Sequence, residues 1–298
     1  MNSRNLAILA LFIVALIYGL NYSIAKDVMP NYVKPFGFIF LRVTGATLIF
    51  WTLGLFVKEK SIEKEDFKKI AFAAFFGVGI NFLSFFKGLS LTTPINASVI
   101  AVITPIMVLI FSSILLKEKL TYRKIVGVFV GLFGAIILIL YGNSSNLDGK
   151  DVILGNFLVF LNAVSFGLYL VLVKKLATKY HPILFVKWLY LFGVIYIVPF
   201  SIQEAIEINW QTMPTTIYYK VGFVVLLTTC VTYLFNLFAL TKLKPTTVGV
   251  FIYLQPVIAT IYALLVGSDS LSFVKVVATI IIFLGVYLVT KDGYKSTK

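Results

Sequence analysis

The sequence predicts an all-α polytopic membrane protein with ten transmembrane helices, arranged as two inverted five-helix repeats. Three observations support this fold class. First, apolar residues make up 60% of the chain and charged residues 13%, whereas soluble proteins average about 45–50% and about 25%. Second, matching residues recur 151 positions apart along the chain. Third, basic residues concentrate in every other connection between the apolar segments.

Ten apolar segments are long enough to cross a membrane, because a helix needs about 20 residues to span the hydrocarbon layer. The mean hydropathy of the chain is +0.98, and no connection is long and polar enough for a soluble domain. The first segment is too long for a typical signal peptide and lacks a cleavage site, so we expect it to be the first span. The predicted spans are 6–25, 36–57, 69–88, 94–116, 124–141, 152–172, 183–202, 219–240, 246–266 and 274–290.

The recurrence at 151 residues indicates an internal duplication that covers the whole chain. We expect the first repeat to occupy residues 1–146 and the second residues 147–298. The matching pairs are Pro94 and Pro245, Pro105 and Pro256, Glu118 and Asp269, Leu120 and Leu271, Lys124 and Lys275, and Gly134 and Gly285.

The distribution of positive charge predicts the orientation of the chain in the membrane. If the N-terminus is cytoplasmic, the inner connections hold eighteen Lys and Arg residues and the outer ones six, as the positive-inside rule requires. Both termini are then cytoplasmic, and a repeat of five spans must enter the membrane in inverted orientation. The same loops account for the net charge of +14. No basic and aromatic pattern typical of nucleic-acid binding accompanies it, so we expect no nucleic-acid partner.

Pro105 and Pro256 are predicted to kink their helices near the middle of the membrane. Each lies eleven residues after the proline that opens its helix, Pro94 or Pro245. This distance is about 16 Å along the helix axis, in a hydrocarbon layer about 30 Å thick. Proline removes a backbone hydrogen bond, which marks either a packing kink or a solute-binding region. The duplication at matched depth favours a central cavity, with Pro105 and Pro256 as gating or kink positions.

Polar and aromatic side chains within the predicted spans are candidates for the lining of this cavity. The alternative for each polar one is a hydrogen bond that joins two helices. As a set they offer amides, hydroxyls and aromatic rings with few charges, which suits a small polar or zwitterionic organic solute. The candidates are Tyr18, Asn21, Tyr22, Asn81, Phe85, Asn96, Thr104, Tyr169, Tyr233, Asn236, Tyr253 and Gln255.

Arg42 is the clearest charge within a predicted span. It is a candidate contact for a substrate carboxylate or phosphate; the alternative is that it snorkels to the interface or pairs with backbone carbonyls. Lys87 and Lys187 lie nearer to the ends of their spans, where snorkelling is the favoured interpretation. No Asp or Glu falls within a predicted span, so we expect no proton relay built from carboxylates.

Small residues on the fifth span predict a close helix–helix contact. Gly127, Gly131 and Gly134 follow one another at the spacing typical of such contacts. The contact is expected either within the monomer or between two copies, as a homodimer through the fifth or tenth helix. The tenth span retains only Gly285 and has Ala278 in place of Gly127, so we expect its contact to be less intimate.

Several classes of function find no support in the sequence. A single cysteine, Cys230, excludes an internal disulfide, and a single histidine, His181, excludes a histidine-based metal centre or catalytic dyad. No phosphate-binding loop, nucleophile elbow or zinc motif is present. We therefore expect no metal, no cofactor and no ATP-driven transport by this chain alone. An intramembrane enzyme would need a nucleophile, metal or acid–base pair at membrane depth, and no convincing set is present.

The motifs described above make the chain resemble the EamA type of the drug/metabolite transporter superfamily. The resemblance rests on Tyr18 to Asn21, Leu41-Arg42, Pro105, Glu118-Lys119-Leu120, Gly127 and Gly134, and in the second repeat on Pro256, Asp269-Ser270-Leu271 and Gly285. It covers essentially the whole chain. It implies a ten-helix fold, a substrate site between the repeats and alternating access without ATP. Asp269 and Ala278 depart from the Glu and Gly usual in the family, which makes symmetric gating less certain.

We therefore expect a secondary transporter of a small organic metabolite, such as an amino acid or a similar polar solute. We expect it to be a multi-pass protein of the cell membrane that acts as an exporter. Its partners would be the small-molecule substrate and the lipid bilayer. One alternative is a phosphorylated-sugar or nucleotide-sugar exchanger of the same superfamily, with Arg42, Lys87 and Lys187 as ligands. Another is a passive channel or a receptor.

Overall fold

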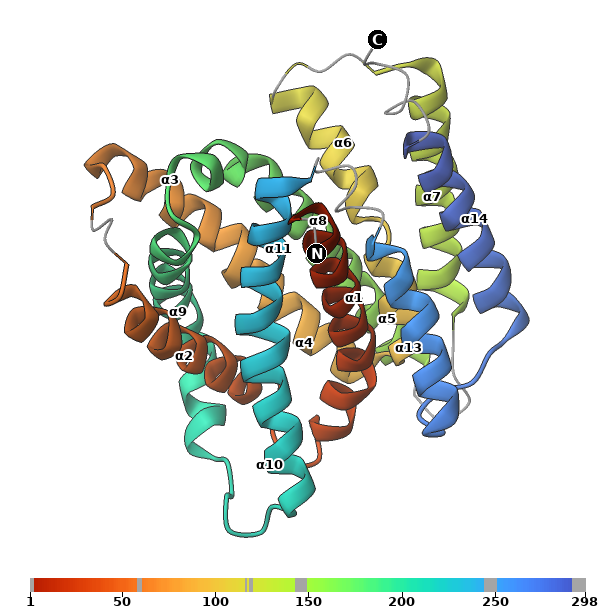
Figure 1. Ribbon diagram of the computed structural model, residues 1–298. Helices are drawn as coiled ribbons and strands as arrows, with labels where there is room; N and C mark the ends of the chain where they lie inside the picture. Colours follow the sequence, from red (N-terminus) through yellow and green to blue (C-terminus); the bar gives the residue numbers. More distant parts are fainter. Residues whose placement is uncertain are drawn as a thin grey trace.

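The structure is a computed structural model that describes residues 3–57, 61–115, 117, 120–142, 149–243 and 251–290. The described chain is entirely helical and passes back and forth through one elongated bundle (Figure 1). The elements of the first half are α1 (Ser3–Val28), α2 (Pro35–Gly54), α3 (Lys64–Ala74), η1 (Phe75–Ile80), α4 (Asn81–Leu91), α5 (Pro94–Ala101), α6 (Thr104–Leu115) and α7 (Tyr122–Tyr141). Those of the second half are α8 (Gly149–Lys179), α9 (Pro182–Ile206), α10 (Thr215–Gly222), η2 (Phe223–Val231), α11 (Thr232–Lys242), α13 (Leu254–Leu265) and α14 (Phe273–Thr290).

These elements confirm the all-α polytopic fold with ten helices. Eight described helices are long and apolar enough to cross a membrane, and Leu254–Leu265 and Phe273–Val289 are shorter apolar helices. The third crossing combines α3, η1 and α4, and the eighth combines α10, η2 and α11. The helices extend beyond several predicted ends. The third crossing begins at Lys64, so Asp66, which was predicted to lie outside the span, is a buried residue of its first turn.

Local sequence signals explain where several helices begin. Pro35, Pro94 and Pro182 each occupy the first turn of their helix, where the missing N–H costs no hydrogen bond. The side chain of Thr93 accepts a hydrogen bond from the backbone N–H of Asn96 at the start of α5. Such a cap satisfies one of the four unpaired N–H groups at a helix start.

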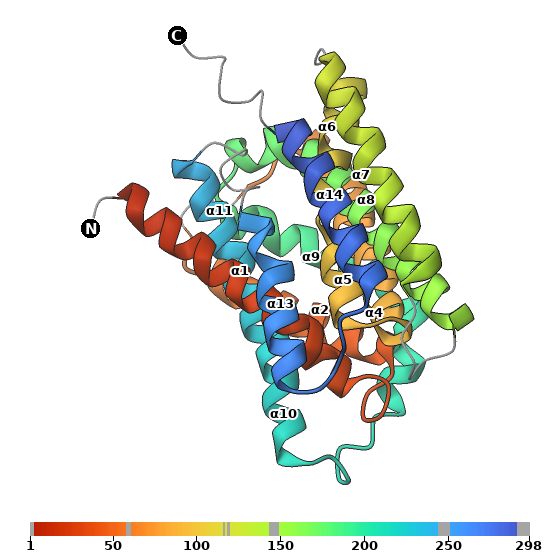
Figure 2. The same ribbon diagram turned by 90° about the vertical axis from the view of Figure 1, so that its right-hand side faces the viewer.

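The packing of the two halves is reciprocal, as expected for two repeats related by a pseudo-two-fold axis. In the first half α1 packs against α11 and α13; in the second half the equivalent helix α8 packs against α4 and against α5 and α6. Likewise α2 packs on η2, and α9 packs on η1. The pairs α2–α9 and α7–α14 join equivalent helices of the two halves. Figure 2 shows α7 and α14 side by side, with α1 crossing α13.

The contact between α7 and α14 corrects an expectation from the sequence. The tenth helix was expected to make the less intimate contact, and this is wrong. A Cβ atom added at Gly285 would lie 2.3 Å from the backbone N of Gly131, and one added at Gly127 would lie 2.7 Å from the carbonyl O of Gly285. One glycine on α14 is sufficient for a close approach of the two helices, because it lies opposite the glycines of α7. The glycine surface is therefore used within the monomer, one of the two expected arrangements.

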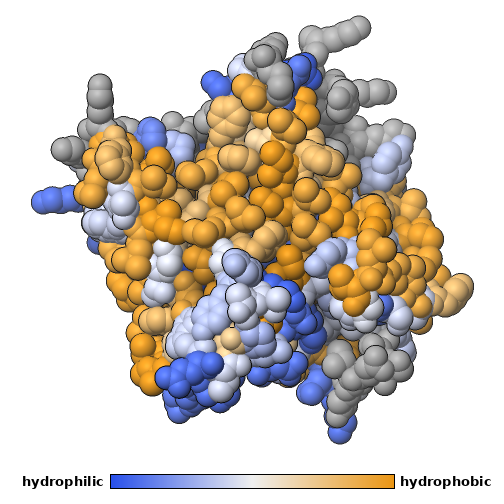
Figure 3. Space-filling model, turned by 60° about the horizontal axis from the view of Figure 1, so that its bottom comes forward, coloured by the Kyte–Doolittle hydropathy of each residue, from blue (hydrophilic) through white to orange (hydrophobic). Residues whose placement is uncertain are grey.

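The outer surface of the bundle is apolar around its middle and polar at its ends. Large apolar side chains such as Phe129 and Phe133 on α7 and Ile280 on α14 are more than half exposed, which is unfavourable in water but not in lipid. The end that Figure 3 brings forward carries a polar patch beside this apolar surface. The described molecule thus has the surface of a protein surrounded by a bilayer.

Ion pairs between the halves gather at the two ends of the bundle. At one end Lys34 pairs with Glu207 at 2.6 Å, and Lys220 pairs with Asp27. At the opposite end Lys179 Nζ lies 2.5 Å from Glu63 and 2.7 Å from Asp66. The predicted partner of Asp269 in the repeat, Glu118, lies outside the described residues, as does Pro245.

Candidate substrate-binding site

The fourth crossing is broken at the predicted proline. α5 ends at Ala101 and α6 begins at Thr104, with Pro105 in its first turn. Between them the backbone tightens, with hydrogen bonds from Val102 N to Val99 O at 3.2 Å and from Ile103 N to Ile100 O at 3.0 Å. Thr104 is buried beside the break. Proline explains the interruption, because it has no N–H and its ring clashes with the preceding turn.

The ninth crossing shows a related interruption. Residues 251 and 252 are helical, a turn follows at Tyr253, and α13 begins at Leu254, so that Pro256 lies in its first turn. Pro105 and Pro256 therefore occupy the start of the second part of their respective crossings. Tyr253 is half-buried and its ring centroid lies 6.0 Å from that of Phe283 on α14.

Helices α1, α4 and α13 bring together three of the predicted residues. Tyr22 Oη donates a hydrogen bond to Gln255 Oε1 at 3.4 Å. The ring of Tyr22 meets the ring of Phe85 edge-on, with centroids 5.7 Å apart. The sequence separation of 233 residues between Tyr22 and Gln255 places this contact between the two repeats.

A second group of predicted tyrosines lies around α1 and α11. Tyr18 Oη lies 3.0 Å from Oγ1 of Thr232, and Tyr233 packs edge-on against Tyr190 of α9 at 5.3 Å. Tyr169 of α8 lies within electrostatic range of both Tyr18 and Tyr233. Six helices (α1, α4, α8, α9, α11 and α13) thus contribute to one polar and aromatic cluster. We call it the central cluster, and it comprises Tyr18, Tyr22, Phe85, Tyr169, Tyr190, Thr232, Tyr233 and Gln255.

Arg42 lies against this cluster and is buried. Its side chain is 4% exposed. Nε donates to Thr229 Oγ1 at 2.7 Å, and the guanidinium carbon lies 4.1 Å from the ring centroid of Phe82. Arg42 is within electrostatic range of the tyrosines at 18, 190 and 233. The alternative to a substrate contact was snorkelling to the interface or pairing with backbone carbonyls. The structure shows a carbonyl contact, because Nη2 donates to the carbonyl O of Thr228 at 3.5 Å.

Each repeat carries a π-helical segment in its third crossing, which the sequence did not predict. η1 spans Phe75–Ile80, and the 151-residue offset maps it onto positions within η2, Phe223–Val231. π-Helical segments are rare and are frequent at functional sites. In η2, Thr229 Oγ1 donates to Val224 O at 2.9 Å, and Arg42 donates to the same threonine oxygen. The segment is therefore the surface that receives Arg42.

Two of the predicted asparagines are engaged in bonds that join helices. Asn81 Nδ2 donates to the carbonyl O of Asn162 at 3.3 Å, and Asn162 Nδ2 donates back to the carbonyl O of Asn81 at 3.1 Å. Asn96 Nδ2 donates to Gly142 O at 2.6 Å and to Asn156 Oδ1 at 3.3 Å. Asn81 and Asn96 therefore form hydrogen bonds that join two helices, which was the alternative to lining a cavity.

Two predicted residues, Asn21 and Asn236, make no hydrogen bond with the central cluster within the described part of the chain. Asn21 is 3% exposed, and its Oδ1 has no hydrogen-bond partner among the described residues. Asn236 is half-buried on α11.

Sequence reasoning missed Tyr190, Thr228 and Thr229 as members of the site. Tyr190 has an aliphatic counterpart, Ile39, at the repeat offset, so it does not stand out as a polar position shared by the two repeats. The run Thr228-Thr229-Cys230-Val231-Thr232 stands out as polar within an apolar segment and could have drawn attention to η2. Within the described part of the chain no three His, Cys, Asp or Glu residues are grouped as a metal site would require.

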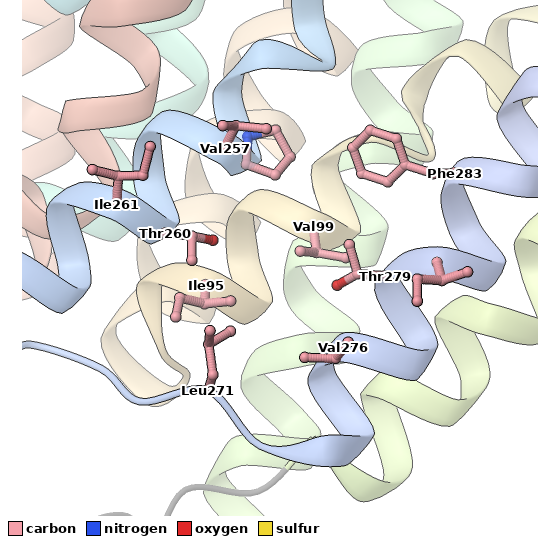
Figure 4. A pocket seen from close by; sticks show the side chains of 11 residues that line it. Ile95, Val99, Val257, Thr260, Ile261, Leu271, Val276, Thr279 and Phe283 are labelled. Carbon is pink, nitrogen blue, oxygen red and sulfur yellow. The ribbon is translucent and has the colours of Figure 1, made fainter.

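A cleft of about 310 Å³ opens between α5, α13 and α14, and the predicted residue Pro256 is part of its lining. Figure 4 shows Ile95 and Val99 of α5 between the two other helices, with Phe283 at one end of the cleft. Its lining is apolar apart from Thr260 and Thr279, and Val257 and Ile261 are more than half exposed beside it. A polar solute would find few hydrogen-bond partners there.

Comparison with known proteins identifies the family. The model of the EamA-like transporter family matches residues 5–140 and 153–291. An uncharacterized transporter of Archaeoglobus fulgidus is 26% identical over 99% of this chain and 100% of its own length. The uncharacterized transporter YoaV of Bacillus subtilis is 26% identical over 95% of this chain and 96% of its own length.

A solved crystal structure has the same fold, with a TM-score of 0.63 over 98% of this chain and 99% of that one at 18% identity. The family match covers both halves of the chain, and the ten-helix structure agrees with it. The chain therefore belongs to the EamA-like transporter family and is a membrane transporter, not an enzyme.

Proposed function

We propose that the protein is a secondary transporter that exports a small organic metabolite, an amino acid or a similar polar solute, across the cytoplasmic membrane. The observation that carries this proposal is the central cluster. It supplies hydroxyl, amide and aromatic groups from helices of both repeats, and its Gln255 directly precedes Pro256 in the first turn of α13. A small polar solute can exchange its hydration for such groups.

The proposed mechanism is alternating access, and the reciprocal packing of the two halves supports it. The central cluster is built from α1 and α4 of the first half and from α8, α9, α11 and α13 of the second half. A rocking movement of one repeat against the other would open the cluster to each side in turn. Both termini are proposed to be cytoplasmic, on the basis of the basic residues of the inner connections.

The exchange of phosphorylated sugars receives less support. That function would use Arg42, Lys87 and Lys187 as ligands. The Lys187 ammonium instead lies 4.9 Å from the ring centroid of Trp51 and 5.9 Å from that of Trp188, whereas Arg42 lies over Phe82. The two cations therefore do not form one phosphate site.

Flux measurements in proteoliposomes test the proposal. We expect saturable uptake and counterflow of at least one solute in a panel of amino acids and related metabolites, with and without a pH or sodium gradient. Folded protein that moves no solute would refute a transporter of this class, and flux without saturation or counterflow would indicate a channel.

Matched tyrosine variants connect the flux to the central cluster. Tyr18→Phe and Tyr233→Phe remove one hydroxyl each, and loss of one hydrogen bond of about 1 kcal/mol should weaken transport roughly fivefold. Tyr219→Phe is the control, because Tyr219 is 75% exposed at the end of the bundle. Equal behaviour of all three variants would place the site elsewhere.

A further inference from the structure

Arg42 is a buried cation for which the described residues provide no acidic partner. Two of its three nitrogens donate to η2: Nε to Thr229 Oγ1 at 2.7 Å and Nη2 to the carbonyl O of Thr228 at 3.5 Å. Nη1 makes no hydrogen bond with a described residue. Lys275, the other cation buried to this degree, pairs with Asp269 at 2.6 Å. Of the two buried cations in the described chain, Lys275 therefore has a counter-ion, whereas Arg42 has none among the described residues.

A buried charge without a counter-ion is unfavourable, because its hydration is lost and nothing equivalent replaces it. The rings of Phe82 and Phe86 have centroids 4.1 Å and 5.4 Å from the guanidinium carbon of Arg42. Their cation–π attraction compensates for part of the lost hydration of this charge. Both rings are neutral. The positive charge of Arg42 therefore remains available to an anion that enters the site.

A buried hydroxyl beside Arg42 also has no hydrogen-bond partner among the described residues. Thr228 is fully buried, and its Oγ1 makes no hydrogen bond with a described residue. Tyr190 is fully buried as well, with its ring centroid 5.3 Å from that of Tyr233. Thr228 is the residue whose carbonyl receives Nη2, and the ring of Tyr190 packs 6.4 Å from that of Phe82. Such buried hydroxyls are usually satisfied, and each can donate to an oxygen of an anion.

We propose that the transported solute carries a carboxylate and that Arg42 binds it, with the hydroxyls of Thr228 and Tyr190 as further donors. This inference rests on the proposed transport function and specifies its substrate class. The planar guanidinium matches a carboxylate with two parallel hydrogen bonds. One cation balances a monoanion, and Lys187 is held at Trp51 and Trp188 and cannot add the second charge that a phosphate dianion needs. The aromatic surroundings suit an apolar remainder of the solute.

Pairs of solutes that differ only in the carboxylate test the proposal on the wild-type protein. Alanine, leucine and phenylalanine are each compared with their carboxamides in counterflow and competition, together with simple monocarboxylates and inorganic phosphate. We expect the acids to compete about 10- to 100-fold better than the amides, the range typical of a hydrogen-bonded charge. Equal competition by acids and amides, or preference for phosphate, would overturn the proposal while leaving the transport function intact. Absence of any flux would refute both.

Three variants separate ligand binding from a structural role of Arg42. Arg42→Gln should remove the preference for acids over amides, and Arg42→Lys should keep the preference with weaker binding. Thr229→Val removes the acceptor of Nε but leaves the charge, so the protein should lose stability and retain the preference. Lys187→Gln is the control for loss of a cation elsewhere. If Arg42→Gln still prefers acids over amides, the proposal is contradicted. If Arg42→Gln does not fold, the proposal is contradicted when Arg42→Lys binds acids with the affinity of the wild type.

Discussion

Asp269 caps the amino end of α5, since its Oδ2 accepts a hydrogen bond from the backbone N–H of Ile95 at 3.1 Å. Its other oxygen accepts from Lys275 Nζ at 2.6 Å, and the two side chains of this ion pair are 0% and 1% exposed. A negative charge is favourable at a helix amino end, where N–H groups are unpaired. The connection between α13 and α14 in the second repeat is thereby fixed to the broken helix of the first.

We expect Asp269→Asn to destabilise the protein strongly. Asparagine can still accept from Ile95, but Lys275 would be left as a buried charge without a partner, which costs about 3–5 kcal/mol. Thermal unfolding of the purified protein in detergent measures the effect. The double variant Asp269→Asn with Lys275→Met should recover most of the loss. Wild-type stability of Asp269→Asn alone would show that the ion pair is not needed.

The exposed pair of Lys34 and Glu207 provides the contrasting case. The hydrogen bond from Lys34 lowers the pKa of Glu207, so the folded state binds a proton at this carboxylate less readily than the unfolded chain. Its small contribution to stability is present above the ordinary pKa of glutamate, about 4.3, and is lost as the pH falls below it. We expect Glu207→Gln to melt like the wild type at neutral pH within error, because exposed pairs contribute little. A large destabilisation at neutral pH would contradict this expectation.

The glycine contact between α7 and α14 makes a third prediction. A Cβ atom at Gly285 would lie 2.5 Å from the Cα of Gly131, so Gly285→Ala should push the two helices apart and lower the melting temperature. The cost should resemble other overpacked sites, about 1–3 kcal/mol. Gly222→Ala is the matched control, because nothing lies within 4 Å of its added Cβ. Equal melting of both variants would show that the helices can separate without loss.

The number of helices, their order and the duplication could be predicted because each depends on properties that are local or periodic in the sequence. Apolar length gave the crossings, and the 151-residue offset gave the repeat. The helix interruptions at Pro105 and Pro256 could be anticipated, since the effect of proline on its own helix is local. The α7–α14 contact was misjudged because the room for close packing depends on which residues face each other, and Gly285 faces Gly131.

The candidate site was harder to predict because side-chain partners depend on helix rotation. Asn81 and Asn96 were grouped with Tyr18 and Tyr22 by depth alone, yet the structure pairs the asparagines with carbonyl and amide groups of neighbouring helices. Arg42 could not be assigned from its position in the span, since the polar run in η2 that receives it lies 186 residues away.

The reciprocal bonds between Asn81 and Asn162 allow a fourth prediction, tested by a double-mutant cycle. Each amide donates to the backbone of the other residue, so Asn81→Ala and Asn162→Ala should each reduce stability by about 0.6 to 1.7 kcal/mol, the range for polar contacts in membranes. Since each alanine leaves the other bond intact, the two effects should be nearly additive. Transport by the single variants should persist in folded protein. Loss of transport without loss of stability would return Asn81 to the list of solute contacts.

The orientation of the bundle gives the last prediction. Cys230 is the single cysteine and is buried, at 6% exposed, so a membrane-impermeant maleimide should not label the wild-type protein in intact cells. Two variants introduce exposed cysteines for labelling. Asn209→Cys places one in the connection between α9 and α10, where Asn209 is exposed, and Lys68→Cys places one on α3, where Lys68 is exposed near the opposite end of the bundle. If both termini are cytoplasmic, Asn209→Cys is labelled from outside and Lys68→Cys only after permeabilisation. The reverse pattern would place the termini outside and would require that the positive-inside rule fails for a chain with a three-to-one bias in its connections.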